Sequence, residues 1–165
     1  MKEVQPQEAF QKKYPEQVVL VVTWDEKNNR PNIITLGWSM QTSFNPPMIA
    51  ISVGKTRHSH GLISKTKEFV LCFPTEKMEK EVLFCGSTSG SQTDKFKETG
   101  LTPIPSKKVK PPLIKECLAC FECKVAGILD TGDHTIFAGE VLKAYISETP
   151  SKRIYNFGGA NLKGL

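Results

Sequence analysis

The residues best suited to chemistry lie where a strand-like run ends at Gly54 and a helix is expected to begin. The first turn of that helix carries two cations, an imidazole and a hydroxyl, on Lys55, Arg57, His58 and Ser59. Backbone N–H groups at a helix N-terminus lack partners within the helix, and the helix dipole is positive there. The segment therefore predicts an anion site suited to a mononucleotide phosphate. The alternative is an ordinary capped helix on a basic surface.

A second loop, residues 85–96, offers small polar side chains between which an anion can approach the backbone closely. Its sequence is Cys-Gly-Ser-Thr-Ser-Gly-Ser-Gln-Thr-Asp-Lys-Phe, with Lys95 in the helix predicted to follow it. The loop is not a Walker A motif, because the Gly-Lys-Ser/Thr ending is missing. Taken alone it is a flexible loop, and it belongs to the anion site only if it faces the first segment.

The elements that must position these segments are mostly strands. Runs rich in β-branched residues and bounded by turn residues predict strands over residues 17–24, 32–40, 48–53, 68–73, 117–129 and 134–146. The first three strands predict a meander, and the proline pair at 46–47 fixes where the third begins. Short helices are predicted at three places: after the N-cap Thr56, over residues 76–84 with Gly86 closing the helix, and over residues 92–99.

Many strands, few helices and no internal repeat predict an antiparallel β-barrel. A Rossmann domain is not predicted, because no Gly-x-Gly-x-x-Gly is present. The 165 residues are enough for a single domain, residues 1–165, whose core needs neither disulfides nor a structural metal. The tail, residues 151–165, has weak structural signals of its own and is a candidate for packing on a partner.

Composition restricts the partners and the location. The net charge is +5, but the lysines are scattered and the densest cluster is only Lys107, Lys108 and Lys110, so we predict no nucleic-acid binding. No apolar run approaches the roughly 20 residues that span a bilayer, so we predict no membrane association. The N-terminus lacks the apolar stretch of a secretory signal, so we expect a cytoplasmic location, where the five cysteines stay reduced.

Several blocks, taken together, resemble a known family. They are Asn-Ile-Ile-Thr-Leu-Gly-Trp-Ser-Met at 32–40, Asn-Pro-Pro-Met-Ile-Ala-Ile-Ser-Val-Gly at 45–54, Arg-His-Ser at 57–59, Ser-Gln-Thr-Asp-Lys-Phe at 91–96 and Gly-Asp-His at 132–134. In order and spacing they resemble the flavin reductase-like family, and within it the flavoredoxin group. The resemblance spans the chain from about Val18 to Ile146.

The resemblance implies a mainly β fold with short helices: an antiparallel, Greek-key-like split β-barrel that is homodimeric and binds one non-covalent FMN per subunit at the interface. It implies that the phosphate is held by Lys55, Arg57, His58 and Ser59 and by Lys95. It places Asn32 and Trp38 at the isoalloxazine ring, with Ser52 and Gly54 bordering it. His134 approaches the ring edge and is the candidate catalytic residue. Thr35, Ser39 and Met40 complete the implied cofactor-binding set.

Two of these residues also have simpler interpretations. A tryptophan can cover a flavin face and an imidazole can hydrogen-bond the polar edge of the ring. Trp38 is equally compatible with the barrel core, and His134 with the first position of a hairpin strand. The residues alone leave both alternatives open.

The spacing Cys117-x-x-Cys120-x-x-Cys123 is one at which thiolates bind zinc or an iron–sulfur cluster. Successive residues of a strand point to opposite faces, so Cys117 and Cys123 would share one face and Cys120 the other. A fourth nearby cysteine is also absent. We therefore prefer buried structural thiols.

A three-histidine metal site and a hydrolase are both unsupported. His58 and His60, which would join His134 in such a site, stand two residues apart at a helix start and point to different faces. No Gly-x-Ser-x-Gly elbow is present, and no cysteine has a recognisable basic neighbour. No metal site is predicted.

Two functions remain. The first is a flavoredoxin-like electron carrier that exchanges electrons with a redox protein partner or a small-molecule acceptor. The second is an oxidoreductase in which FMN accepts hydride from NAD(P)H and passes electrons to free flavin or ferric iron. The resemblance favours the carrier. A hydride donor would need open space over the flavin.

Overall fold

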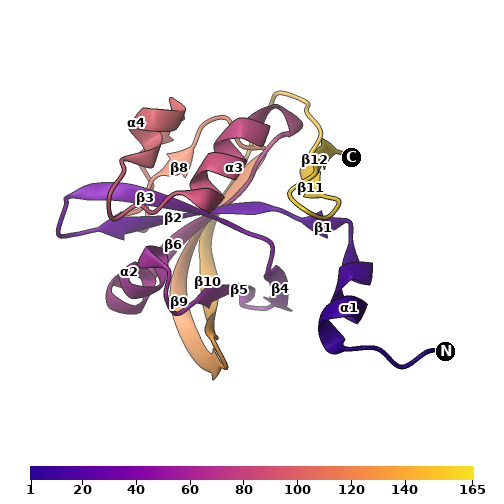
Figure 1. Ribbon diagram of the computed structural model, residues 1–165. Helices are drawn as coiled ribbons and strands as arrows, with labels where there is room; N and C mark the ends of the chain where they lie inside the picture. The colour runs from indigo at the N-terminus through magenta and orange to yellow at the C-terminus, as the bar shows by residue number, and fades with distance from the viewer.

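The fold is organised by one seven-stranded antiparallel sheet with the order β3-β2-β6-β9-β10-β5-β4 (Figure 1). The computed structural model describes residues 1–165. The strands of the sheet are β2 (Val19–Asp25), β3 (Arg30–Leu36), β4 (Ser39–Phe44), β5 (Pro47–Gly54), β6 (Glu68–Phe73), β9 (Ala119–Thr131) and β10 (His134–Ile146). β3 and β4 form its two edges, yet only Gly37 and Trp38 join them in the chain. The sheet must therefore curl until its edges meet.

Helices cover both faces of β2 and β3. Figure 1 shows α3 (Glu79–Ser87) and α4 (Lys95–Thr99) on one side and α2 (His58–Thr66) on the other. The remaining helical elements are α1 (Pro6–Phe10), η1 (Gln11–Lys13) and η2 (Glu76–Met78). None of the helices is long and apolar enough to cross a membrane.

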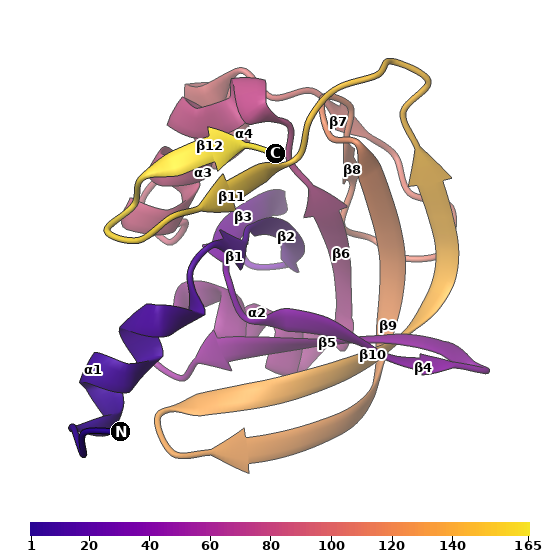
Figure 2. The ribbon, with the colours of Figure 1, turned by 90° about the vertical axis from the view of Figure 1, so that its right-hand side faces the viewer.

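Two small sheets complete the fold. The N-terminal β1 (Glu16–Gln17) pairs with β11 (Ile154–Asn156), which in turn pairs with β12 (Leu162–Gly164). Figure 2 shows this three-stranded sheet beside α3, at the opposite end of the molecule from the tip of the long β9–β10 hairpin. The short β7 (Pro103–Ile104) pairs with β8 (Leu113–Ile114). The tail is therefore ordered by pairing with the N-terminal segment of its own chain.

The core consists of two apolar layers that share the central strands. Leu20 and Val22 pack into the layer under α3 and α4, whereas Val19 and Val21 pack into the layer that contains Ile63 of α2. Successive side chains of a strand point to opposite faces, so a strand buried on both faces reads as a continuous apolar run. This is why residues 19–22 show no alternation in the sequence.

The structure confirms the strand content and the long 134–146 hairpin strand, but it corrects the path between residues 32 and 40. That segment is two strands, because β3 pairs with β2 whereas β4 pairs with β5. The predicted meander is therefore wrong: its second strand is divided between opposite edges of the sheet.

Three helix ends also differ from their predicted positions. The N-cap of α2 is Arg57, not Thr56, and no side chain caps this helix. Gly86 lies inside α3, which continues to Ser87. The last helix begins only at Lys95, because the Asp94 carboxylate accepts the Lys97 N–H at 3.2 Å and caps the helix there.

A buried carboxylate holds the long loop before β8. Glu122 is fully buried, and its oxygens accept the N–H groups of Lys107 at 2.9 Å and Val109 at 3.2 Å, that of Lys108, and the Tyr145 hydroxyl. Burial acts to raise the pKa of the Glu122 carboxyl, but these donors together lower the pKa below its ordinary value. The ionised Glu122 carboxylate therefore stabilises the folded state at pH values above the ordinary glutamate pKa. This contribution to folding stability is lost as the pH falls through the lowered pKa of Glu122.

We expect Glu122→Gln to lower the free energy of unfolding by roughly 1–3 kcal/mol at neutral pH, because a neutral amide accepts these N–H groups less strongly. The loss should shrink in acid. Urea denaturation at several pH values measures it. Glu116→Gln is the matched control, because Glu116 is exposed and accepts a single backbone N–H, from Thr102. Equal stability of the two variants at neutral pH would contradict the account.

Candidate functional site

The two predicted anion-binding segments face each other. The start of α2 and the loop after α3 enclose a cavity of about 170 Å³, here called the anion cavity, lined by residues 56–59 and 85–90 with Ile34 and Lys95. No side chain caps α2, so its first N–H groups are available to a ligand. Ser87, Thr88 and Ser89 line the opposite wall; the Ser87 hydroxyl donates to the Leu83 carbonyl oxygen and the Ser89 hydroxyl pairs with that of Ser91. The loop that contains residues 85–90 therefore faces the first segment, as it must if it is to belong to the anion site.

Lys95 lies in the anion cavity but is mostly engaged with the protein. Its Nζ donates to the carbonyl oxygens of Ile33 at 2.6 Å and Cys85 at 2.7 Å, and the residue is 3% exposed. Burial lowers the pKa of the Lys95 ammonium, and the charge of Arg57 lowers it further. An ammonium has three donors, so one remains for an anion. Lys95 ties β3 to α3 and can contribute a single charged hydrogen bond.

Asn32 does not line the anion cavity but contacts two residues that do, Ser59 and Gly90. Its amide nitrogen donates to the Thr23 hydroxyl at 3.1 Å and to the Ser59 hydroxyl at 2.8 Å. Its amide oxygen is buried without a partner and lies against Gly90, where a Cβ would collide with it. Asn32 therefore fixes how closely the loop after α3 approaches the start of α2.

A second cavity, of about 210 Å³, adjoins the first and shares Ile34, Arg57 and Gly86 with it. We call it the ring cavity; it is lined by Glu16, residues 34–38, Ser52, Gly54, Arg57, Gly86 and His134. It brings together five of the predicted residues besides Arg57, namely Thr35, Trp38, Ser52, Gly54 and His134. The cavity lies at the seam where the two edges of the sheet meet.

Trp38 and His134 form the aromatic wall of the ring cavity. Their ring centroids are 4.7 Å apart with a tilt of 41°, and Trp38 is 51% exposed. Trp38 therefore does not belong to the barrel core. His134 is the first residue of β10, opposite Gly54, and its Nδ1 lies 2.7 Å from the Asp133 carboxylate. That contact fixes the orientation of the imidazole.

Four other predicted residues either line neither the anion cavity nor the ring cavity, or bind another group of the protein instead. Lys55 Nζ lies 3.7 Å from the Asp130 carboxylate and lines neither cavity. His58 borders the anion cavity, but its Nε2 lies 3.0 Å from the buried Asp25 carboxylate. Ser39 and Met40 line a third cavity of about 450 Å³, here called the outer cavity, with Lys13, residues 15–17, Gly37, Trp38, residues 50–52 and Ile136.

The sequence did not reveal the contribution of the N-terminal segment. Glu16 lines the ring cavity, and Lys13 Nζ lies 5.3 Å from the centroid of the Trp38 ring. A two-residue strand such as β1 has no periodicity from which to predict it. Its position depends on pairing with β11, about 140 residues later in the chain.

The cysteine spacing has a structural explanation that differs in one detail from the prediction. Cys117 precedes β9, so it joins Cys120 and Cys72 in one core layer, whereas Cys123 lies in the other. The expectation that Cys117 and Cys123 share a face is therefore wrong. All five cysteines are free and buried. No cluster of His, Cys, Asp or Glu side chains is arranged to hold a metal ion.

Comparison with known proteins identifies the family. The model of the flavin reductase like domain matches residues 11–162. A protein from Archaeoglobus fulgidus is 42% identical over 129 residues, covering 78% of this chain and 71% of that protein. This chain belongs to the flavin reductase-like family. The resemblance and the split-barrel fold expected from the sequence are both confirmed.

Two further proteins to which this chain is similar have different functions. The solved structure of flavoredoxin from Desulfovibrio vulgaris matches with a TM-score of 0.83 at 26% identity, covering 92% of this chain and 87% of that one. An NADH-dependent FAD reductase from Streptomyces globisporus is 26% identical over 136 residues, covering 82% of this chain and 72% of that protein. The protein is a flavoprotein of electron transfer or flavin reduction.

The residues at the seam fit a flavin. The anion cavity offers Arg57, uncapped helix N–H groups and hydroxyls to a phosphate, and the ring cavity continues from it to an aromatic wall. A Cβ at Gly54 would lie 3.5 Å from both Arg57 Cγ and His134 Nε2, and would narrow the space between the anion cavity and the ring cavity. When bound, a flavin supplies the chemistry of one- and two-electron transfer. The chain supplies the binding and the orientation of the ring.

We expect Arg57→Ala to weaken FMN binding about tenfold to a hundredfold, the effect of losing a charge-assisted hydrogen bond. Lys55→Ala is the matched control. It removes a cation two residues away whose ammonium faces Asp130, and we expect a loss below about fivefold. Fluorescence titration of the apoprotein measures both affinities. Equal losses in the two variants would remove Arg57 from the site.

Proposed function

We propose that the protein binds one FMN per subunit and acts as a flavoredoxin-like electron carrier. The observation that carries the proposal is the joined pair of cavities, cationic and hydroxyl-rich at one end and aromatic at the other. This polarity matches a ligand with a phosphate at one end and a flat ring at the other. The similarity to flavoredoxin from Desulfovibrio vulgaris supports the same function.

The size of the anion cavity supports FMN over FAD. The cavity holds about 170 Å³ and is bounded by the loop 85–90 and by buried Lys95. A terminal phosphate fits such a space. The adenosine monophosphate that distinguishes FAD from FMN would need room beyond the phosphate, on the side that the loop after α3 bounds.

His134 is the proposed residue at the ring edge. Its imidazole stands in the ring cavity beside Trp38 and is held by Asp133. An imidazole in this position can hydrogen-bond the polar edge of the isoalloxazine and stabilise charge that appears there on reduction. Electrons then pass to a redox protein partner or to a small-molecule acceptor. We also propose a cytoplasmic location, which suits five reduced thiols.

The outer cavity supports a second candidate, an NAD(P)H-dependent flavin or ferric reductase. This cavity of about 450 Å³ begins at Trp38 and Ser52, which also line the ring cavity. It provides the open space that a hydride donor needs beside the flavin. The similarity to an NADH-dependent FAD reductase supports this candidate as well.

Steady-state oxidation of NADH and NADPH by the FMN-loaded protein separates the two functions. With ferric citrate or free FMN as acceptor, we expect no turnover above that of free FMN for a carrier. We expect the dithionite-reduced protein to transfer its electrons to an oxidised redox protein such as a cytochrome. Turnover of either dinucleotide at enzymatic rates would overturn the carrier and establish the reductase.

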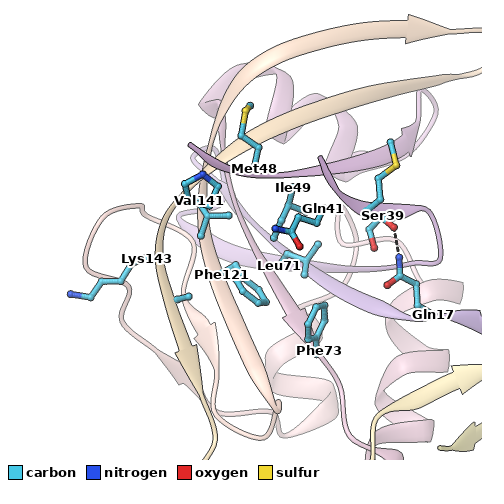
Figure 3. Close-up of a pocket in the computed structure, with 13 residues that line it drawn as sticks. Gln17, Ser39, Gln41, Met48, Ile49, Leu71, Phe73, Phe121, Val141 and Lys143 are labelled. Carbon is cyan, nitrogen blue, oxygen red and sulfur yellow. Dashed lines mark hydrogen bonds between the residues drawn. The ribbon is translucent and has the colours of Figure 1, made fainter. Parts of the chain in front are cut away.

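We also propose that the protein is a homodimer. β4 is an edge strand, and its Met40 and Phe44 are 61% and 89% exposed. Beside it lies an apolar cavity of about 510 Å³, whose wall includes Leu71, Phe73 and Phe121 (Figure 3). An exposed edge next to an apolar face is a liability that a second copy of the chain would cover.

We expect the wild-type protein to have the mass of two chains of 18.4 kDa. The Phe44→Asp variant should have a mass closer to that of one chain. Light scattering coupled to gel filtration measures the mass. Phe10→Asp is the control, because Phe10 is 64% exposed but lies on α1, away from β4. A wild-type monomer, or a dimer unaffected by Phe44→Asp, would contradict this interface.

A further inference from the structure

The N-terminal segment fixes a carboxylate beside the ring cavity. Both Glu16 carboxylate oxygens lie 3.0 Å from the position that a Cβ would take at Gly37, so only glycine lets the carboxylate rest on the link between β3 and β4. The Glu16 side chain is 16% exposed, and its Oε1 accepts a hydrogen bond from Lys13 Nζ at 2.8 Å. Pairing of β1 with β11 holds the backbone of Glu16 opposite Asn156.

This carboxylate stands where three cavities meet. Glu16 lines the ring cavity, the outer cavity and a fourth space of about 310 Å³ between the end of β3, α3 and the tail. It is the only acidic residue in the lining of any of the three. The other charged groups of the ring cavity are Arg57, which also lines the anion cavity, and the imidazole of His134.

We propose that Glu16 and Lys13 tune the redox balance of the bound flavin in opposite directions. This inference rests on the proposed FMN site. Reduction adds electrons to the flavin, and a fixed negative charge beside it disfavours the reduced, more negative state. Lys13, paired with Glu16 and 5.3 Å from the Trp38 ring centroid, contributes the opposite charge. Glu16 is thus a residue that sets the flavin potential by its charge.

The placement of the pair supports a role beyond local stability. A solvent-accessible ion pair three residues apart, with side chains 35% and 16% exposed, contributes little to folding. Yet Gly37 keeps the space for this carboxylate open, and the acid stands at the point where the ring cavity opens to the outer cavity. A ligand in either cavity therefore experiences its charge at short range and with reduced solvent screening.

Potentiometric titration of the FMN-loaded protein tests the proposal. We expect Glu16→Gln to shift the midpoint potential in the positive direction and Lys13→Met to shift it in the negative direction. Equivalently, Glu16→Gln should raise the affinity for reduced FMN relative to oxidised FMN by at least about fivefold. Glu16→Asp, which keeps the charge, should retain most of the wild-type potential. Glu8→Gln, an exposed acid on α1, is the control.

The outcomes are distinguishable. Shifts of opposite sign in the two variants support the inference. Normal FMN binding with an unchanged potential in Glu16→Gln would overturn it while leaving the FMN site intact. Shifts of the same sign in both variants would also overturn it, because they would indicate a general disturbance of the segment. A wild-type protein that binds no FMN would refute the proposed function instead.

Discussion

The structure depends on one topological constraint: the two edge strands of the seven-stranded sheet are joined by only two residues. β3 ends at Leu36 and β4 begins at Ser39, so Gly37 and Trp38 must bridge the two edges. The three residue steps from Leu36 to Ser39 span at most about 11 Å of extended chain, so the sheet has to curl until its edges lie close together. The two edge strands do not pair with each other. The seam between them is where the ring cavity opens, with Trp38 on one side and the β5–β10 pair on the other.

The helices on the two faces then give this seam its chemical polarity. α2 follows β5 directly and points its uncapped N-terminus at the seam, and the loop after α3 approaches from the other face. Buried polar groups hold this arrangement: Lys95 binds two carbonyl oxygens, and Asn32 links β3 to Ser59. Such groups are costly to bury unless they are paired, and here the pairing joins the elements that form the site. Stability and the geometry of the anion cavity therefore rest on the same contacts.

Much of the fold and of the site could be predicted from the sequence, because local residue patterns determine those parts. Strand runs and the pair of anion-binding segments follow from residue type and spacing, and the order of the motifs indicated the family. The break at Gly37 was missed, because the residues on both sides of it are strand-like and only the pairing partners divide them. The glycine itself is the one local signal of a bend. The orientations of Lys55 and His58 were missed for a related reason. Each side chain is fixed by an acid distant in the sequence, Asp130 and Asp25 respectively.

We propose that a flavin lies across the seam, with its phosphate between α2 and the loop after α3. A crystal structure of the protein with FMN tests this most directly. We expect the phosphate within hydrogen-bond reach of Arg57 and the Ser87–Ser89 hydroxyls, and the ring in contact with Trp38 and His134. FMN bound elsewhere, or its phosphate at the open end of the outer cavity, would contradict it.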